Sequence, residues 1–157
     1  MTNNYPGLAR GPIDHQASSV INMIANERIA MGSSVKLIAE PSSEILPRAE
    51  EGDTALEALY GVAVGGDADG IYGDGSLGTS LDGFQAADEA TQAIVVVTQG
   101  RCLARVDTGV SIGDPLEQGA NAGALRTATT GEVIAVALQA STGTDIIAVD
   151  VQREGAV

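Results

Sequence analysis

The sequence predicts a mainly β fold, a small β-barrel or β-sandwich built from two related half-units, with at most one or two short helices. The first observation is that short apolar runs alternate with turn residues along the chain, which contains 20 glycines. The second is the scarcity of aromatic residues: with no Trp, one Phe and three Tyr, the core must be filled by Val, Ile, Leu and Ala. The third is an internal repeat, in which segments 29–35 and 110–116 share one spacing of apolar and glycine residues.

Residues 1–17 are expected to form an extended N-terminal arm, followed by a single β domain over residues 18–157. Prolines and glycines interrupt the arm, and no apolar periodicity is sustained in it. The chain does not open with a basic segment followed by an apolar one, so a secretory signal is not expected. A disordered tail is the alternative interpretation of the arm. Four arm residues are the candidate contacts to a neighbouring subunit or a capsid: Tyr5, Leu8, Arg10 and Ile13.

Two segments carry helix signals. The apolar residues of segment 18–30 suit a short helix that begins after Ser18 or Ser19, but Val20–Ile24 equally suits a strand. Further along, Asp53 is expected to cap a short helix over residues 54–59.

The internal repeat places a glycine at the same point of each copy, Gly32 in the first and Gly113 in the second. Glycine supplies the backbone freedom for a tight turn, and Ser33 and Asp114 suit the polar corner that follows it. We therefore expect one structural turn at each of these glycines. Two further pairs of segments resemble each other as strands: 60–64 with 134–138, and 94–97 with 146–149.

Between the two halves lies an acidic, glycine-rich loop at about residues 65–83, which lacks a core pattern. Its carboxylates on Asp67, Asp69 and Asp74 are oxygen ligands of the kind that Ca²⁺ prefers. The closing Glu of an EF-hand is missing, so a solvated loop is the main interpretation. A calcium-dependent surface-binding β module is kept as an alternative.

The charge balance excludes several classes of partner. Eight basic residues against 21 acidic ones give a net charge of −13 and a pI near 4.1. Nucleic acids and anionic membranes repel such a surface, so direct binding to either is not expected. The longest wholly apolar runs, 93–97 and 133–138, are also far shorter than the about 18 residues of a membrane-spanning helix.

No catalytic residue, cofactor site or metal site is predicted. The chain has a single histidine, His15, and a single cysteine, Cys102, which excludes an intrachain disulfide and any site built from several His or Cys. It also lacks a Walker loop and a glycine-rich dinucleotide motif between a strand and a helix. The only lysine, Lys36, lies within a predicted strand, whereas biotinyl and lipoyl carriers present their lysine at a hairpin tip.

One enzymatic alternative remains, a homodimeric retroviral-type aspartic protease that uses Asp107. The string Asp107-Thr108-Gly109 follows a predicted strand, and two such carboxylates, one from each chain, would share a proton. Against this alternative, Val110 stands where that family has Ala or Ser, and the later apolar run 133–135 lacks the expected glycine. Since Asp and Gly are ordinary turn residues, a simple turn is the main interpretation.

Six segments, in order along the chain, carry a resemblance to a known family: Ile29-x-x-Gly32-x-x-Val35, Tyr60–Gly65, Val95–Gly100, Val110–Leu116, Ile134–Leu138 and Asp145–Val149. Together they resemble the small capsid cement or decoration proteins of tailed double-stranded DNA viruses. The resemblance implies a small β-barrel or β-sandwich, often a homotrimer, on the outer capsid surface of the virion, where it stabilises contacts between major capsid subunits. It further implies the major capsid protein and other copies of the chain as partners, without a cofactor or a catalytic group.

Overall fold

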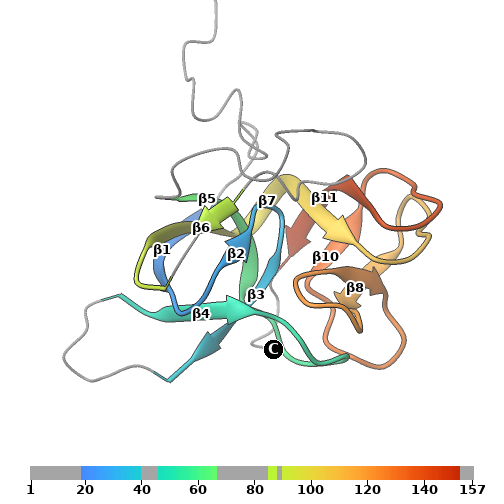
Figure 1. The fold of residues 1–157 in the computed structure, drawn as a ribbon. Coiled ribbons are helices and arrows are strands. Elements are labelled where there is room, and N and C mark those ends of the chain that lie inside the picture. Colours follow the sequence, from blue (N-terminus) through green and yellow to red (C-terminus); the bar gives the residue numbers. More distant parts are fainter. Residues whose placement is uncertain (1–18, 40–45, 67–84, 88–89, 153–157) are drawn as a thin grey trace, which may run out of the picture.

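The structure, a computed structural model, describes residues 19–39, 46–66, 85–87 and 90–152. In these ranges the chain forms β-strands and no helix, which confirms the predicted mainly β fold (Figure 1). The expected arm and most of the acidic loop lie outside the described residues. The strands are β1 (Ser19–Ala25), β2 (Ile29–Ala30), β3 (Ser34–Ile38), β4 (Arg48–Glu51), β5 (Gly61–Gly66), β6 (Gln85–Ala87), β7 (Ala93–Val106), β8 (Pro115–Gln118), β9 (Leu125–Thr127), β10 (Ala135–Ala137) and β11 (Asp145–Gln152).

Five strands close into a barrel, which together with β2 and β6 we call the first unit. Around the barrel the order is β1, β4, β3, β5 and the first half of β7 (residues 93–99), and β7 pairs again with β1. The strands β1 and β4 are parallel, and all other neighbours are antiparallel. A buried apolar cluster belongs to this barrel: Met23, Ala25, Ile29, Val35, Ala49, Ala63, Ala86, Ala87, Ile94 and Val96.

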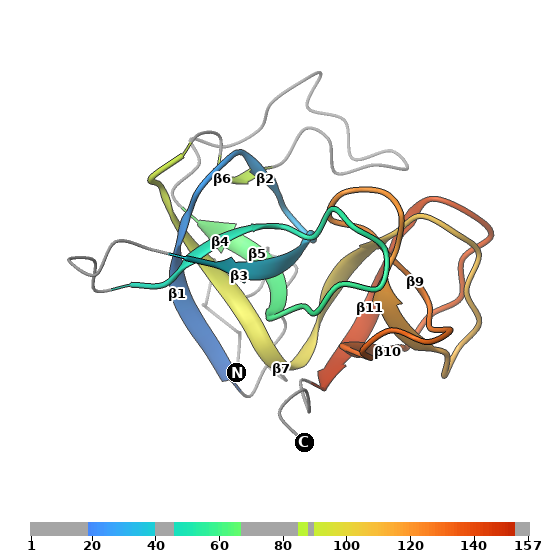
Figure 2. The ribbon, with the colours of Figure 1, turned by 90° about the horizontal axis from the view of Figure 1, so that it is seen from below.

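A second ring of paired strands, the second unit, begins where the first ends. Its order is the second half of β7 (residues 100–106), β9, β8, β10 and β11, and β11 pairs again with β7. The strands β7 and β9 are parallel, and the other neighbours are antiparallel. Since β7 takes part in both rings, the two units lie side by side around one long strand (Figures 1 and 2).

The two units have the same strand order and the same strand directions, so each strand has an equivalent. The strand β1 matches the second half of β7, β3 matches β8, β4 matches β9, β5 matches β10, and the first half of β7 matches β11. The registers agree as well, because Lys36 lies opposite Glu50 in the first unit as Glu117 lies opposite Arg126 in the second. An isolated bridge in the second unit takes the place of the β2–β6 pair. The fold is therefore an internal duplication.

The core of the second unit follows from this equivalence. Apart from the residues of β6, which have no equivalent strand in the second unit, every residue of the first cluster matches a buried apolar residue of the second unit. The matching residues are Ala104, Val106, Val110, Leu116, Leu125, Ala137, Ile147 and Val149.

The sequence repeat reflects the duplication. The register confirms two of its predicted matches, 29–35 with 110–116 and 60–64 with 134–138. The third predicted match is wrong by one residue, because Ile94 is equivalent to Ile147 and not to Ile146. Since side chains alternate along a strand, that shift would exchange the buried face of β11 for its outer face.

Each copy of the repeat contains a glycine turn. The φ angle is +86° at Gly32 and +89° at Gly113, a region that residues with a side chain rarely adopt. The N–H of Gly32 donates to the carbonyl oxygen of Ala63 at 2.7 Å, and the N–H of Gly113 donates to that of Ala137 at 2.8 Å. Each turn is thereby fixed to the same strand of its unit, β5 or β10.

The two segments with helix signals form a strand and a turn in the structure. Segment 18–30 contains the strand β1, so the strand alternative holds there. The helix expected over residues 54–59 is wrong, because the chain turns there and Leu56 has a φ of +71°. The N–H of Leu56 donates to the carbonyl oxygen of Gln118 in the second unit at 3.2 Å. A tertiary contact thus overrides the local helix propensity.

The first described strand, β1, begins beside the same residue of β7 at which the last strand, β11, ends. Ser19 in β1 and Gln152 in β11 both pair with Gln99 of β7. The next residue, Gly100, is buried and has a φ of +112°. The junction between the two units therefore lies beside both ends of the described chain.

We predict that Gly113→Ala lowers the free energy of unfolding by about 1 kcal/mol, because its positive φ strains any residue with a Cβ. The space around Gly113 is open, so the strain comes from the backbone alone. Gly143→Ala is the matched control, since its surroundings are equally open and no positive φ is found there. Urea unfolding measures both variants, and equal midpoints for the two would contradict the prediction.

Candidate functional site

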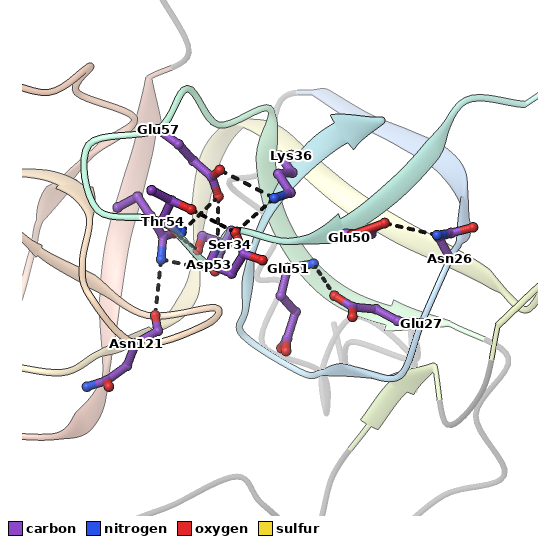
Figure 3. Close-up of polar contacts among 12 residues, drawn as sticks. Asn26, Glu27, Ser34, Lys36, Glu50, Glu51, Asp53, Thr54, Glu57 and Asn121 are labelled. Atoms are coloured by element: carbon purple, nitrogen blue, oxygen red, sulfur yellow. Dashed lines mark hydrogen bonds and ion pairs between the residues drawn. The ribbon is translucent and has the colours of Figure 1, made fainter. Parts of the chain in front are cut away.

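The described residues contain no group of three or more His, Cys, Asp or Glu side chains that could hold a metal ion. Within those same ranges, no helix is long and apolar enough to cross a membrane. Many polar contacts gather instead where the two units meet (Figure 3). We call this region the seam and define it by residues 33–34, 51–57 and 117–123.

Gln118 forms the centre of the seam. Its side chain is fully buried, and its Nε2 donates to the carbonyl oxygens of Gly52, Gly119 and Asn121, each at 3.1 Å. Its Oε1 accepts a hydrogen bond from the hydroxyl of Ser34 at 2.5 Å. Because Ser34 and Gly52 belong to the first unit, one buried amide joins both units and satisfies polar groups that water cannot reach.

Backbone contacts around Gly123 reinforce the seam. The N–H of Gly123 donates to the carbonyl oxygen of Gly52 at 2.7 Å, and its own carbonyl accepts the N–H of Ser34 at 3.0 Å. Its φ is +71°, and an added Cβ would collide with the side chains of Ser33 and Glu51, which hydrogen-bond to each other. A glycine is therefore needed here to bring the two units into contact.

Lys36, the only lysine, is paired at the edge of the seam. Its Nζ lies 2.9 Å from Oδ1 of Asp53 and 3.3 Å from Oε2 of Glu57 (Figure 3). The Asp53 carboxylate raises the pKa of Lys36, and the Lys36 ammonium lowers the pKa of Asp53. Lys36 thus lies within β3 with two carboxylates around its amine, an arrangement that gives no support to a carrier lysine.

Further acidic side chains line the first unit beside the seam. Glu27 accepts the N–H of Glu51 at 3.0 Å, and the amide of Asn26 donates to Glu50 at 2.9 Å (Figure 3). Burial raises the pKa of Glu27, and the charges of Glu50, Glu51 and Asp53 raise it further. This crowding of carboxylates produces a local surface that repels anionic partners.

Glu117 is a fully buried carboxylate in β8. Its oxygens accept the N–H of Thr129 at 3.0 Å, the N–H of Gly131 at 2.7 Å and the hydroxyl of Thr129 at 3.0 Å, and they pair with Nε of Arg126 at 3.0 Å. Burial alone would raise the pKa of Glu117, but these hydrogen bonds lower it below its ordinary value. The charge is therefore compensated and fixes segment 126–131 against β8.

Asp107 lies in a turn of the second unit, where Asn26 is its equivalent in the first. Its Oδ2 accepts the N–H of Asn121 at 3.2 Å, and its Oδ1 is buried. A Cβ at Gly119 would lie only 2.6 Å from that Oδ2, so the carboxylate is packed closely against this loop. The carboxyl holds the turn at residues 119–121, and the arrangement gives no support to the protease alternative.

The remaining residues singled out in the sequence are divided between the core and the undescribed part. Cys102 is buried in the second unit. The others lie outside the described residues: Tyr5, Leu8, Arg10, Ile13, His15, Asp67, Asp69 and Asp74. Sequence reasoning missed Gln118 and Glu117. The available signal was two successive polar residues within a strand, which breaks the alternation expected of a half-buried strand.

Comparison with known proteins finds a similarity in fold and none to a family model or a curated sequence. No protein-family model matches the sequence, and no curated protein matches it. The chain is similar in fold to the N base of head fiber gp8.5 in bacteriophage phi29. The TM-score is 0.58 at 10% sequence identity, and the match covers 86% of this chain and 94% of the fiber chain. Since the match covers most of both chains, the fiber base shares the overall architecture and not merely one barrel.

We predict that Gln118→Ala lowers the free energy of unfolding by about 2–4 kcal/mol, because the buried hydroxyl of Ser34 and the buried carbonyls of Gly52 and Gly119 each lose a partner. The control is Gln152→Ala, since this glutamine is exposed and, among the described contacts, its side chain bonds only to Asp150. Chemical unfolding monitored by circular dichroism measures both. Equal stability of the two variants would show that the amide does not hold the units together.

Glu117 should also make the stability depend on pH. The pKa of Glu117 is lowered in the folded state. The ionised carboxylate therefore stabilises the fold at pH values above its ordinary pKa of 4.5, and this contribution is lost as the pH falls below that value. Glu117→Gln is expected to be less stable by about 2–3 kcal/mol at pH 7 and to lose less further stability between pH 5 and pH 3. Thermal melts over that range test this, and parallel pH profiles of the two proteins would refute it.

Proposed function

We propose that this chain is a structural protein of the virion of a tailed double-stranded DNA virus. Its finer role would be that of a capsid cement or decoration protein, which binds the outer surface of the capsid and stabilises contacts between major capsid subunits. The observation that carries the proposal is the fold likeness to a phage head fiber base over 86% of the chain. The resemblance of the six sequence segments to cement proteins supports the same role independently.

The architecture suits a protein that adheres to a surface. Among the described residues, every strand of the nine-stranded sheet pairs on both sides, so the sheet offers no open edge for uncontrolled association. The net charge of −13 keeps the chain soluble and away from packaged DNA. Both properties are required of a protein that accumulates in many copies on a capsid.

We propose the major capsid protein and further copies of this chain, in a homotrimer, as its partners. A trimer contacts the capsid at several points, and multivalency raises the apparent affinity by about 10²–10⁴ over a single contact. Weak individual contacts would therefore suffice for firm attachment. The arm residues Tyr5, Leu8, Arg10 and Ile13 remain the proposed contacts to the capsid or to a neighbouring subunit.

We predict that the chain co-sediments with capsids of its virus and that deletion of residues 1–17 weakens this binding by at least about tenfold. The melting temperature should stay unchanged, because the sequence places residues 1–17 outside the β domain. Deletion of residues 153–157 is the control truncation.

Asp107→Asn should bind like the unaltered chain, whereas the protease alternative requires that this variant lose a peptidase activity. A chain that never sediments with capsids would refute the proposed role.

A further inference from the structure

The outer faces of the two units differ in what covers them. In the first unit, the outward residues Val62, Val64 and Val97 are almost completely buried. They belong to the same apolar cluster as the core of the second unit, and so does Leu59. The second unit therefore covers this face of the first.

The equivalent face of the second unit is partly uncovered. By the register of the duplication, Leu59 corresponds to Val133, Val62 to Val136 and Val64 to Leu138, whereas Val97 corresponds to the charged Asp150. Val133 is 38% exposed and Leu138 is 37% exposed, whereas Leu59 is 6% exposed and Val64 2%. The second unit thus keeps apolar side chains at three of these four positions, and two of them, Val133 and Leu138, are exposed where their first-unit equivalents are buried.

These residues belong to a wider apolar strip. Leu138 donates its N–H to the carbonyl of Ala148 at 2.9 Å, and Ala148 lies opposite Leu103 in β7. Arg101 and Arg105 flank Leu103 on the same face. Asp150 lies opposite Arg101, so this face combines apolar side chains with charges of both signs.

A complementary residue occurs on the first unit. Within the chain, Gln118 and Leu59 meet at the seam, since a Cβ on Gly52 would touch both side chains. The register makes Leu37 the first-unit equivalent of Gln118. Gln118 is fully buried, whereas Leu37 is an apolar residue that is 49% exposed. The first unit therefore presents an uncovered leucine at the position through which the second unit makes its contact.

We propose that the outer face of the second unit binds the first unit of another copy of this chain, head to tail. In this contact Leu37 of the second copy packs against Val133 and Leu138, as Gln118 packs beside Leu59 within one chain. The contact uses the same position of the unit as the internal interface, with an apolar leucine in place of the hydrogen-bonding glutamine. Such a head-to-tail contact closes into a ring, for example a trimer, or extends into a chain. The proposal rests on the self-association included in the proposed function and assigns the surfaces that bring it about.

The test uses the full-length chain and two single substitutions, Val133→Glu on one surface and Leu37→Glu on the other. Either substitution places a carboxylate against the apolar side chains of the contact, so each variant is expected to associate at least about 100-fold more weakly than the unaltered chain. An equimolar mixture of the two variants should form a one-to-one pair, because each supplies the surface that the other lacks. Light scattering and analytical ultracentrifugation measure the masses.

Two further variants serve as controls. Ile112→Glu changes a residue that is 71% exposed and lies in neither surface, so it should associate like the unaltered chain. Leu138→Glu replaces Val133→Glu if the latter fails to give the circular dichroism spectrum of the folded chain.

The proposal is overturned by any of three results. The first is association of Val133→Glu and Leu138→Glu that equals that of the unaltered chain. The second is a complex that stops at two copies, or a variant mixture that does not pair, since both indicate like surfaces in contact. The third is an unaltered chain that stays monomeric at every concentration, which removes self-association but leaves the capsid-binding role to be decided by co-sedimentation.

Discussion

A single strand, β7, closes both barrels, and the rest of the structure depends on it. Its 14 residues span roughly 46 Å, long enough for one half to complete the first unit and the other half to complete the second. At the junction, Gly100 adopts a positive φ, which allows the strand to change course between the two rings. Both rings include β7, so neither can close without it, although each unit has its own core. The buried amide of Gln118 then fixes the angle at which they meet.

The sequence was sufficient for those features that depend on local patterns. Alternating apolar residues and two glycines at equal positions predicted the strands, the turns at Gly32 and Gly113, and the duplication itself. The seam could not be predicted from the sequence, because Gln118 bonds to Gly52 and Ser34, which are 66 and 84 residues away along the chain. Such partners are defined by topology and leave no periodic signal. The failed helix over residues 54–59 has the same origin, since a contact with the second unit determines its backbone.

The duplication preserves backbone geometry more strictly than side-chain chemistry. At one equivalent cross-strand position, the first unit has Lys36 opposite Glu50, and the second has Glu117 opposite Arg126, with the charges exchanged. Glu117 is also fully buried, whereas Lys36 is partly exposed. The register and the strand directions are thus kept although the charges of the paired side chains are reversed and their burial differs. The two halves therefore present different side chains on one scaffold.

The meeting of Ser19 and Gln152 at Gln99 has a consequence for how the chain can be rearranged. In a chain that lacks residues 1–18 and 153–157, a short linker could join Ser19 to Gln152, since both adjoin one residue of β7, and new termini could be opened at the exposed turn that contains Ile112. A circularly permuted chain of this kind would keep every strand pairing. A protein fused to the new termini would then be attached at the turn that contains Ile112, in the second unit.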